Sequence, residues 1–437
     1  MIRYLVFGMG ETGLSVARHL KKMNIQAVYY DTRLNPPNLP SFEKIISKSD
    51  VILGNFNDRL FENIDCLVVS PGLSDKEPLI QKALQLGIKI ISDIDLFVES
   101  VTKDFVVITG SNGKSTVTEL LSLMCKKSNI KVSAGANLGR PALDLLKDNA
   151  DLYLLELSSF HLHRCQKLPA KVAVLLNISN DHLDWHGSEK NYHQAKYRIY
   201  KEALSSVYNR NLKGCLSHLN SNPKISFGLC EVEGNHYGIL SDGADKFLSK
   251  NQKKLLSSHE VKILGSHNLE NILAAMAVGE LIGLDTSPMI EAIKEFKGLP
   301  HRMEFVENYK SIEFINDSKG TNVGAAIASI NSLEGPIILL AGGQGKGGDF
   351  KFFANSVHKK IKKIILFGKD SKLIEKEFKD YVSSTCVESL KDAVHYATKY
   401  GHEGDKVLLS PACASFDQFD SYISRGEEFC RIVRGLN

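Results

Sequence analysis

Short runs of apolar residues alternate with segments of helical periodicity along the whole chain. Near the N-terminus, apolar runs at residues 4–7, 27–30, 51–53, 67–69 and 88–91 are expected to form strands. Apolar residues within 14–20 have the spacing of a helix and separate the first two runs. Because strands that are joined through helices usually lie parallel in one sheet, this pattern predicts a βαβ start.

The same alternation continues to the C-terminus and suggests three units, with breaks near Asp93 and Leu299. The spacing of the apolar residues in 117–124 predicts a helix that begins at about Ser115. The stretch 205–259 is less periodic and is expected to hold turns and short strands. Further strands are expected at residues 105–108, 153–155, 172–176, 312–315, 337–340, 364–367 and 407–409. The pattern therefore predicts an α/β protein with mostly parallel sheets and domains 1–92, 93–298 and 299–437.

Composition narrows the class of protein. Of the 437 residues, 43% are hydrophobic and 24% are charged, as in folded globular proteins. The formal charge of +4 comes without a basic block, so nucleic acid is not an expected partner. No apolar run approaches the roughly 20 residues of a membrane span, and no signal-peptide pattern opens the chain. Eight cysteines without a CxxC pair indicate reduced thiols, so we expect a cytoplasmic protein.

The segment 109–116, Thr-Gly-Ser-Asn-Gly-Lys-Ser-Thr, lies between a predicted buried strand and a predicted helix. Its backbone N–H groups and the helix N-terminus can bind phosphate, Lys114 can reach terminal phosphates, and Ser115 or Thr116 can bind Mg²⁺. It is not a full Walker A motif, because Ile108 stands where that pattern needs glycine. The alternative is a glycine-rich turn with a solvated lysine. We expect ATP to bind here through Gly110, Ser111, Asn112, Gly113, Lys114, Ser115 and Thr116.

A second glycine-rich segment, 8–13, follows the first predicted strand and is followed by Asp31 at the interval of a dinucleotide fingerprint. That interpretation would make the protein a nicotinamide-dependent oxidoreductase. The same turn can bind any pyrophosphate, and Thr32 and Arg33 add groups suited to a nucleotide. It can also serve only to pack a helix on a strand, so the residues alone do not name the ligand.

Carboxylate and imidazole groups follow two predicted strands of the central unit. Glu156 can orient Mg²⁺ on ATP, and His182 can be a second ligand, although either can also be a polar group that is satisfied at a strand end. Lys196 is interpreted from the residues alone as a solvated helix lysine. A zinc hydrolase site is the alternative raised by His161, His163, His182, His186 and His193 with Asp181 and Asp184. These residues lack HExxH or another fixed ligand spacing.

Two loops of the last unit, 316–322 and 342–348, follow predicted strands and carry glycines and lysines. Both can present backbone donors and cations to an anion. As isolated loops they are equally well explained as turns.

Taken in order, several of these segments resemble the Mur ligase family. They are residues 109–116, 156–162, 177–186, 265–271, 299–304 and 316–322, and 410–419 resembles the members that add D-glutamate. The resemblance implies a Rossmann-like N-terminal unit, a central P-loop-type ATPase unit and a Rossmann-like C-terminal unit. It also implies ATP-dependent joining of D-glutamate to UDP-N-acetylmuramoyl-L-alanine through an acyl phosphate, in peptidoglycan precursor synthesis.

The resemblance also assigns roles to single residues. Adenine and ribose of ATP would be held by Asn268, Asn271, Arg302 and Asp317. The UDP substrate would contact Thr12, Asp31, Thr32, Arg33, Ser70, Gly72, Asn137 and Ser158. D-Glutamate would contact Thr321, Lys346, Ser415, Phe416 and Tyr422. The catalytic group would be Lys114, Glu156, His182 and Lys196, and two Mg²⁺ ions would be held by Ser115, Glu156, His182 and Lys196 as a carbamate.

Two features qualify the resemblance. His161 stands where the family pattern has glutamine, which puts the contact of that side chain in doubt. No DNPR segment is present in the last unit, which argues against a member that adds a diamino acid. We expect a monomer. A folate-polyglutamate-type ligase and a nicotinamide-dependent oxidoreductase are the alternative functions.

Overall fold

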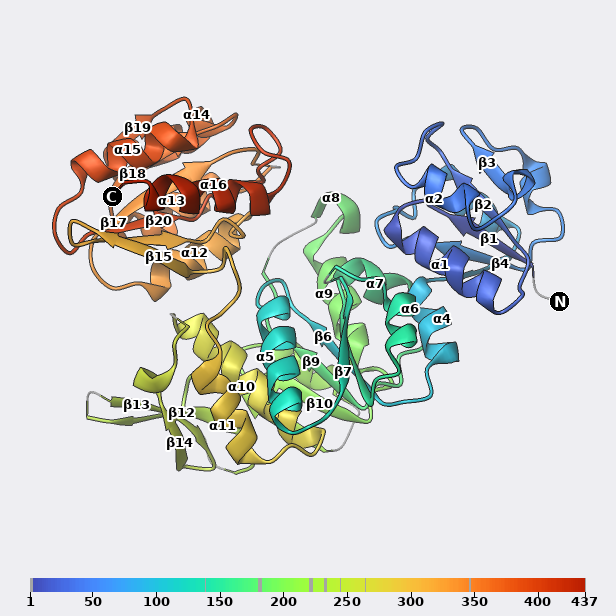
Figure 1. Cartoon of the computed structure of the whole chain (residues 1–437), viewed down its shortest axis with the longest axis horizontal. Coiled ribbons are helices and arrows are strands. Elements are labelled where there is room, and N and C mark those ends of the chain that lie inside the picture. Colours follow the sequence, from blue (N-terminus) through green and yellow to red (C-terminus); the bar gives the residue numbers. More distant parts are fainter. Residues whose placement is uncertain are drawn as a thin grey trace.

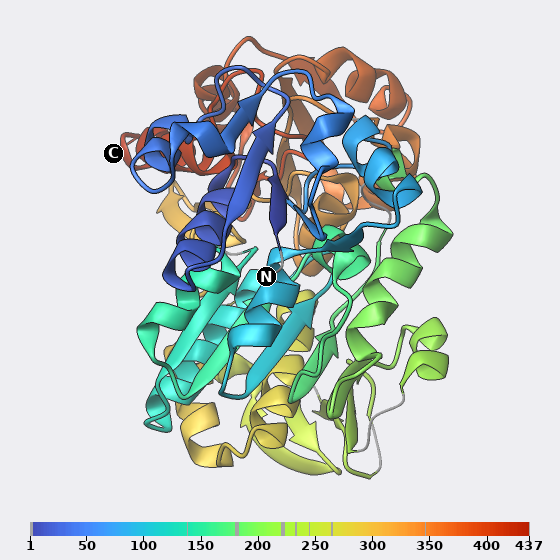
Figure 2. The ribbon, with the colours of Figure 1, turned by 90° about the vertical axis from the view of Figure 1, so that its right-hand side faces the viewer.

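The computed structural model describes residues 3–436 apart from 138, 180–182, 220–222, 232–233, 244, 264 and 346, with only the backbone at 183 and 184. Three lobes follow one another along the chain (Figure 1), each built on its own sheet. Figure 2 shows the same lobes from the side, with the central lobe below the N-terminal and C-terminal lobes. The predicted three-domain α/β architecture is confirmed.

The N-terminal lobe holds a five-stranded parallel sheet of order β3-β2-β1-β4-β5. Its strands are β1 (Tyr4–Phe7), β2 (Ala27–Asp31), β3 (Val51–Leu53), β4 (Cys66–Val69) and β5 (Lys89–Ile91). Its helices are α1 (Glu11–Lys22), α2 (Leu39–Glu43) and α3 (Pro78–Gln85). All five predicted strands are present within a residue or two. The strands β1, β2 and β4 are buried throughout, and such parallel strands appear in sequence as continuous apolar runs.

The central lobe has a nine-stranded sheet of order β14-β13-β12-β11-β10-β9-β6-β8-β7, antiparallel only where β13 pairs with its two neighbours. The strands are β6 (Phe105–Thr109), β7 (Val132–Ala136), β8 (Leu152–Glu156), β9 (Val172–Leu175), β10 (Ser205–Asn209), β11 (Lys224–Phe227), β12 (Tyr237–Asp242), β13 (Asp245–Lys250) and β14 (Lys253–Ser257). The helices are α4 (Asp93–Ser100), α5 (Lys114–Lys127), α6 (Ala142–Leu145), α7 (Ser159–Arg164), α8 (Leu183–His186), α9 (Glu189–Tyr197), α10 (Ser266–Leu281) and α11 (Thr286–Glu295). The described part of the stretch 205–259 holds short strands, turns and short 3-10 segments, so the prediction of turns and short strands is confirmed.

The C-terminal lobe has a six-stranded sheet of order β15-β16-β20-β17-β18-β19, parallel except for the edge pair β15 and β16. The strands are β15 (Glu304–Tyr309), β16 (Ile312–Asn316), β17 (Ile337–Gly342), β18 (Ile361–Phe367), β19 (Ser384–Cys386) and β20 (Lys406–Leu409). The helices are α12 (Val323–Ser332), α13 (Phe350–Val357), α14 (Ser371–Phe378), α15 (Leu390–Tyr400) and α16 (Tyr422–Arg434). Short 3-10 turns elsewhere include η4 (Arg198–Tyr200) and η5 (Lys213–His218).

The hydrophobic cores connect the first two lobes but not the third. One buried cluster runs from the N-terminal sheet through α4 into the central lobe, and the ring of Phe97 packs edge-on against Phe105 and Tyr153. An ion pair between Arg18 of α1 and Asp144 of α6 crosses the same boundary. The two clusters of the C-terminal lobe draw all their members from residues 303–436. The first two lobes thus share a core, whereas the third has cores of its own.

No helix among the described residues combines the length and the apolar character that a bilayer crossing requires.

Candidate active site

Residues 110–113 connect the buried strand β6 to α5, and their geometry is that of a phosphate-binding loop. Gly113 precedes the helix with φ +82°, a conformation that L side chains rarely adopt. A Cβ atom at Gly113 would lie 2.3 Å from Asn271 Oδ1, so this position has room only for glycine. The N–H groups at the start of α5 and the helix dipole favour an anion here. The predicted strand, loop and helix are confirmed.

Hydrogen bonds to the loop after β9 fix the shape of the phosphate loop. Asn112 and Asn177 exchange two bonds, from Asn112 N to Asn177 Oδ1 (2.9 Å) and from Asn177 Nδ2 to Asn112 O (3.1 Å). Ser111 Oγ donates to Ser179 O (3.0 Å) and lies 2.8 Å from the hydroxyl of Tyr192. A loop held in this way is preorganised for its ligand.

Lys114, the first residue of α5, bends back over the loop. Its Nζ donates to Gly110 O at 2.7 Å and to Ser111 O at 3.2 Å. The cation therefore lies over the phosphate loop, and its contact with terminal phosphates stays a prediction.

A polar network joins the phosphate loop to the end of β8 and to the C-terminal lobe. Ser115 Oγ donates to Glu156 Oε2 (2.9 Å), and Asn137 Nδ2 donates to Glu156 Oε1 (2.8 Å). Arg302 Nη2 donates to Ser115 Oγ (3.0 Å). Glu156 is only 2% exposed. A buried carboxylate beside a hydroxyl is the oxygen donor set that Mg²⁺ prefers, so Ser115 and Glu156 fit this ion.

Lys196 lies inside the protein rather than in solvent. It is 2% exposed, and its Nζ lies 5.0 Å from the centroid of the Tyr192 ring. Since the Tyr192 hydroxyl contacts Ser111, Lys196 belongs to the surroundings of the phosphate loop. The interpretation of Lys196 as a solvated helix lysine is wrong. His182 falls outside the described residues, and its role as a metal ligand stays a prediction.

The histidines that suggested a zinc hydrolase do not gather at one point where the structure describes them. His161 Nδ1 lies 2.7 Å from Ser158 Oγ, His163 Nε2 2.6 Å from an Asp75 oxygen, and His186 Nε2 2.9 Å from Ser159 Oγ. The side chains of residues 181, 182 and 184 are not described. These three histidines therefore each have a polar partner, and His193, whose ring centroid lies 6.1 Å from that of Tyr192, belongs to no metal-ligand cluster among the described residues.

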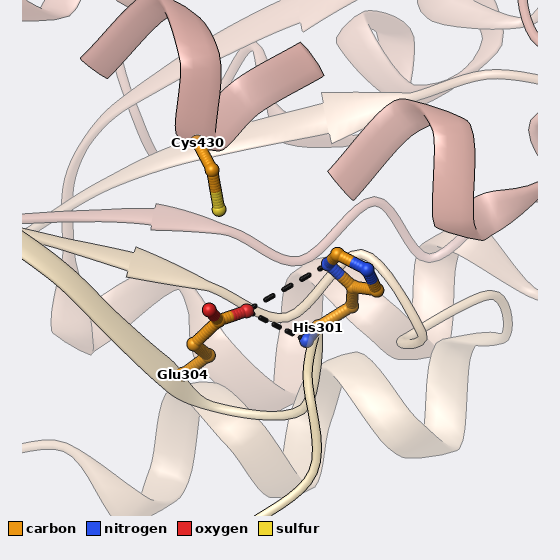
Figure 3. A group of neighbouring side chains, drawn as sticks. All are labelled: His301, Glu304 and Cys430. Carbon is orange, nitrogen blue, oxygen red and sulfur yellow. Dashed lines mark hydrogen bonds and ion pairs between the residues drawn. The ribbon is translucent and has the colours of Figure 1, made fainter. Parts of the chain in front are cut away.

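Among the described residues, a different group, His301, Glu304 and Cys430, has ligand atoms within 4.8 Å of one another (Figure 3). The amide nitrogen of Asn316 lies among them, 2.9 Å from His301 Nδ1, 3.2 Å from Glu304 Oε2 and 3.2 Å from Cys430 Sγ. The amide therefore occupies the place that a metal ion would take.

His161 is a buried member of the capping box at the start of α7. Ser158 N donates to His161 Nδ1 (3.3 Å), and His161 N donates to Ser158 Oγ. Burial lowers the pKa of His161 to about 4, so the ring is neutral at pH 7. A neutral imidazole thus takes the place in the box that the family pattern gives to the uncharged glutamine.

The C-terminal lobe contributes buried charges to the same region. Asp317 Oδ2 accepts hydrogen bonds from Ser329 Oγ (2.6 Å) and Ser410 Oγ (2.8 Å), and burial raises the pKa of Asp317 to about 6. Burial also lowers the pKa of the Arg302 guanidinium, and Glu156 opposes that shift.

Lys319 is a site residue that we did not single out from the sequence. Burial, together with the positive charges of Arg302 and Lys114, lowers its pKa to about 8. Its Nζ lies 3.9 Å from the ring centroid of Tyr422, at the start of α16. Lys319 lies within the segment 316–322 that the resemblance identified. A cation in a polar run after a buried strand is the signal by which the sequence could have identified it.

Asn268 and Asn271 lie one turn apart at the start of α10, and both are buried. Asn271 Nδ2 donates to Asn268 Oδ1 at 3.2 Å, and Asn271 touches the phosphate loop at Gly113. The structure therefore gathers these two asparagines with Arg302 near the phosphate loop. Their assignment to adenine and ribose stays a prediction.

In the N-terminal lobe, the turn after β1 approaches the ends of β2 and β4. Gly8 has φ +104°, and a Cβ atom there would lie 2.6 Å from Ser70 Oγ. Asp31 accepts from Met9 N (2.8 Å) and, through two oxygens, from the guanidinium of Arg33 (2.8 and 2.7 Å). Burial alone would raise the pKa of Asp31, but Arg33 and Met9 N–H hold it below its ordinary value.

The remaining predicted UDP contacts are divided between two lobes. Thr12 lies in the first turn of α1, Thr32 follows β2, and Gly72 follows β4. Asn137 and Ser158 instead lie in the central lobe, where Asn137 bonds Glu156. A ligand that touches both sets would have to extend from the N-terminal lobe to the surroundings of Glu156.

The predicted D-glutamate contacts lie in the C-terminal lobe. Thr321 follows Lys319 in the loop after β16, whereas Ser415 and Phe416 lie between β20 and α16. Ser415 is buried and Phe416 is 63% exposed. Lys346 falls outside the described residues. Tyr422 is connected to the rest of the site through Lys319.

Comparisons with family models and with known proteins point to the same family. Three family models match in succession: "Mur ligase MurD-like, N-terminal domain" at residues 3–92, "Mur ligase middle domain" at 108–279 and "Mur ligase, glutamate ligase domain" at 301–413. The UDP-N-acetylmuramoylalanine--D-glutamate ligase of Marinobacter nauticus is 41% identical over 440 residues, covering 99% of this chain and 98% of the relative. The enzyme of the same name from Acinetobacter baylyi is 42% identical over 441 residues, with 99% and 98% covered.

The fold agrees with solved structures of the same kind. The crystal structure of MurF ligase from Thermotoga maritima in complex with ADP aligns with a TM-score of 0.61 at 18% identity, covering 100% of this chain and 96% of that chain. Matching domains in matching order, together with relatives above 40% identity along the full length, establish that the chain belongs to the Mur ligase family.

Proposed function

We propose that this protein is an ATP-dependent ligase that joins D-glutamate to UDP-N-acetylmuramoyl-L-alanine, with ADP and phosphate as products, in peptidoglycan precursor synthesis. The observation that carries the proposal is the convergence of Lys114, the Ser115–Glu156 pair and Arg302 on one phosphate loop between two lobes. The substrates follow from the relatives that share 41% and 42% of their residues with this chain and are named for this reaction. Because the reaction consumes ATP, we assign it to the cytoplasm.

The first step is attack of the alanyl carboxylate on the γ-phosphate of ATP, which gives an acyl phosphate and ADP. Two anions must approach each other, so positive charge at the site governs the barrier. Lys114, the N-terminus of α5 and the Arg302 guanidinium supply this charge from fixed positions. Lys319, with a pKa of about 8, is mostly protonated at pH 7 and adds to it.

Magnesium fits the oxygen donors of this site. Ser115 Oγ and the Glu156 carboxylate would hold one ion, and His182 and carboxylated Lys196 would complete the set for two. When bound, Mg²⁺ supplies positive charge beside the phosphates.

Carboxylation of Lys196 is supported by its position beside the phosphate loop. Lys196 is 2% exposed, and its Nζ lies 5.0 Å from the ring centroid of Tyr192, whose hydroxyl contacts Ser111. Reaction of the neutral amine with CO₂ would replace this cation with a carbamate anion, which is a metal ligand.

The second step is attack of the D-glutamate amine on the acyl carbon, followed by loss of phosphate from the tetrahedral adduct. We place D-glutamate in the C-terminal lobe, near Thr321, Ser415, Phe416 and Tyr422, with Lys346 as a further contact. Because this lobe has cores separate from those of the other two, it can move as a unit over the central lobe. Such closure would protect the acyl phosphate from water.

The UDP end is proposed to bind at the Gly8 turn. Asp31 and Ser70 contact this turn, and Arg33 bonds Asp31. Thr12, Thr32 and Gly72 are further proposed contacts from the segments that follow β1, β2 and β4. Asn137 and Ser158 would contact the sugar and alanyl end, since they lie next to Glu156. The substrate would thus extend from the N-terminal lobe to the phosphate loop.

A phosphate-release assay tests the proposal. The purified protein is supplied with ATP, Mg²⁺, UDP-N-acetylmuramoyl-L-alanine and D-glutamate, and product formation is followed by mass. Phosphate should appear only when all components are present, and L-glutamate or L-lysine should not replace D-glutamate. Release with a folate substrate and L-glutamate, or oxidation of NADH, would refute the assignment in favour of the two alternative functions.

A further inference from the structure

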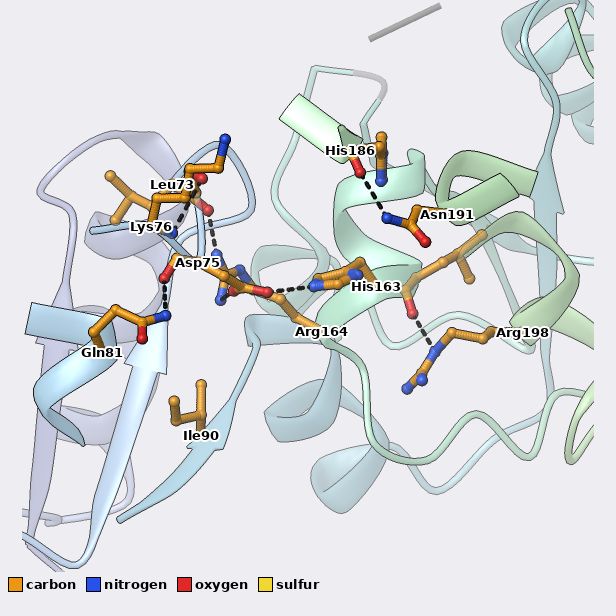
Figure 4. Close-up of polar contacts among 12 residues, drawn as sticks. Leu73, Asp75, Lys76, Gln81, Ile90, His163, Arg164, His186, Asn191 and Arg198 are labelled. Carbon is orange, nitrogen blue, oxygen red and sulfur yellow. Dashed lines mark hydrogen bonds and ion pairs between the residues drawn. The ribbon is translucent and has the colours of Figure 1, made fainter. Parts of the chain in front are cut away.

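A cavity of about 650 Å³ lies between the loop 74–76 of the N-terminal lobe and the helices α7 to α9 with η5 of the central lobe. We call it the α9 cavity. Its lining contains none of the residues assigned above to ATP, magnesium, UDP or D-glutamate. It has the size of small-molecule sites and the position, at a domain boundary, where such sites commonly occur. Figure 4 shows part of its lining, with Asp75 and Lys76 from the N-terminal lobe and His163, His186, Asn191 and Arg198 from the central lobe.

The lining of the α9 cavity is strongly positive. Lys76, Arg198 and Lys201 line it, whereas Asp75 is its one carboxylate. Asp75 is already paired, at 2.6 Å with His163 Nε2 and at 2.9 Å with Arg164 Nη1, as Figure 4 shows. The hydrogen bond from His163, followed by the charge of Arg164, holds the pKa of Asp75 below its ordinary value, so the carboxylate is ionised. Three cationic side chains therefore line the cavity beside one carboxylate that is already paired.

Among the described residues, no carboxylate forms an ion pair with the cations of the cavity. The ammonium groups of Lys76 and Lys201 make no hydrogen bond or ion pair with any residue that the structure describes. Arg198 donates from Nε to Leu162 O (2.8 Å) and from Nη2 to Cys165 O (2.7 Å). These two backbone bonds fix the guanidinium in place.

A buried donor in the same lining lacks an acceptor. The indole Nε1 of Trp185 is shielded from solvent and has no hydrogen-bond partner among the described residues. Buried N–H groups are nearly always paired, so an N–H without a described partner beside a cavity fits a ligand that brings an acceptor. The amide of Gln194 and the ring of His218, which is stacked on Tyr197 at 4.6 Å, line the same space.

We propose that the α9 cavity binds a small phosphorylated anion, separately from the nucleotide in the active site. A phosphate group offers several acceptor oxygens and negative charge, which match two unpaired lysines, an anchored guanidinium and an orphan indole N–H. Because the loop 74–76 belongs to the N-terminal lobe and Arg198 and Lys201 to the central lobe, the bound anion bridges both lobes. Such binding stabilises the folded pair of lobes in proportion to ligand concentration.

Trp185 is the single tryptophan of the chain and lines the cavity, so its fluorescence reports on this site. The experiment titrates inorganic pyrophosphate into the full-length protein in a magnesium-free buffer of low ionic strength, and follows tryptophan emission. We expect a saturable change of emission. The double variant Lys76→Ala/Lys201→Ala should raise the midpoint at least roughly tenfold, because charge-assisted hydrogen bonds are lost.

Two controls separate this site from the active site. The variant Lys190→Ala/Lys351→Ala removes two exposed lysines outside the cavity and should keep the wild-type midpoint. Lys114→Ala weakens binding of pyrophosphate at the phosphate loop and should leave the emission change in place. The proposal is overturned if emission does not respond, if the cavity variant keeps the wild-type midpoint, or if only Lys114→Ala abolishes the response.

Discussion

The guanidinium of Arg302 donates from Nη2 to the hydroxyl of Ser115 at 3.0 Å, although the two residues are 187 positions apart. Ser115 lies in the first turn of α5, and Arg302 lies in the segment that leads into the C-terminal lobe. This contact brings a cation from the boundary of one lobe to the phosphate loop of another. The position of the C-terminal lobe is thus coupled to the charge at the phosphate site.

Replacing Arg302 should therefore reduce the rate of the chemical step. For Arg302→Ala we expect kcat to fall roughly 10²–10³-fold, the usual cost of one preorganised donor to a developing charge. Arg302→Lys keeps the positive charge but loses the planar guanidinium, so its kcat should lie between those of the wild type and Arg302→Ala. Phosphate release measures kcat, and calorimetry with the UDP substrate alone should give wild-type affinity. A wild-type kcat for Arg302→Ala would exclude a role in catalysis.

Lys114→Ala should nearly abolish turnover. The Nζ atom of Lys114 lies over the phosphate loop. Its loss removes the positive charge that stabilises negative charge on the transferring phosphoryl group, which should lower the rate by several orders of magnitude. Binding of UDP-N-acetylmuramoyl-L-alanine should be unchanged, because that substrate is assigned to the Gly8 turn. Turnover close to that of the wild type would contradict the assignment of the loop.

Lys196→Ala tests the carbamate. If the functional form of Lys196 is an anion, the variant should lose most of its activity and recover part of it with added formate or acetate. Methylammonium is the matched control, because it would restore activity only if the lysine acts as a cation. Recovery with methylammonium and none with carboxylates would refute carboxylation.

Lys319 should make stability depend on pH in the alkaline range. Its pKa is about 8 in the folded protein and about 10.4 in an unfolded chain, so between these values the unfolded state binds more protons. Stability of the wild type should therefore rise relative to Lys319→Met as pH increases from 8 to about 10.5, by roughly 1–3 kcal/mol. Below pH 8 the difference in stability between the two proteins should be constant, and Lys319→Met should be the more stable one.

Thermal unfolding of both proteins at pH 7, 9 and 10.5 measures this difference. Lys351→Met, at an exposed position on α13, is the control and should show no such trend. A gap between wild type and Lys319→Met that is independent of pH would show that Lys319 titrates normally.

Phe97→Ala should destabilise the N-terminal and central lobes together. The ring is fully buried between Phe105 and Tyr153, in the cluster shared by the N-terminal and central lobes. Its loss should cost about 3–5 kcal/mol and expose both lobes to proteolysis while the C-terminal lobe stays resistant. Leu84→Ala, at a position that is 54% exposed, should have little effect. Proteolysis of the N-terminal lobe alone would show that the two lobes unfold independently.

The fold could be read from the sequence where local pattern determines structure. The run at 105–108 and the spacing of residues 117–124 correctly predicted β6 and α5, because a buried strand and an amphipathic helix each carry their own signature. The loop between them was predictable for the same reason. Asn268 and Asn271, which the resemblance assigned to one ligand, lie one turn apart at the start of α10.

The features of the site that could not be predicted from the sequence depend on contacts between distant segments. Lys196 is spaced like a surface helix residue, and its burial against Tyr192 arises from how α9 packs on the phosphate loop. The lowered pKa of Lys319 depends on Lys114 and Arg302, which lie in other segments. The contact of Asn137 with Glu156 likewise depends on the register of β7 against β8.

The separate cores of the C-terminal lobe have a consequence for how this protein can be re-engineered. A segment that closes its own apolar interior can be exchanged between homologues as one cassette, with the junction placed ahead of residue 303. A chimera that carries the last lobe of a relative with another amino-acid preference should fold and take on that preference. The N-terminal lobe offers no such junction, since cutting after β5 would divide the cluster around Phe97.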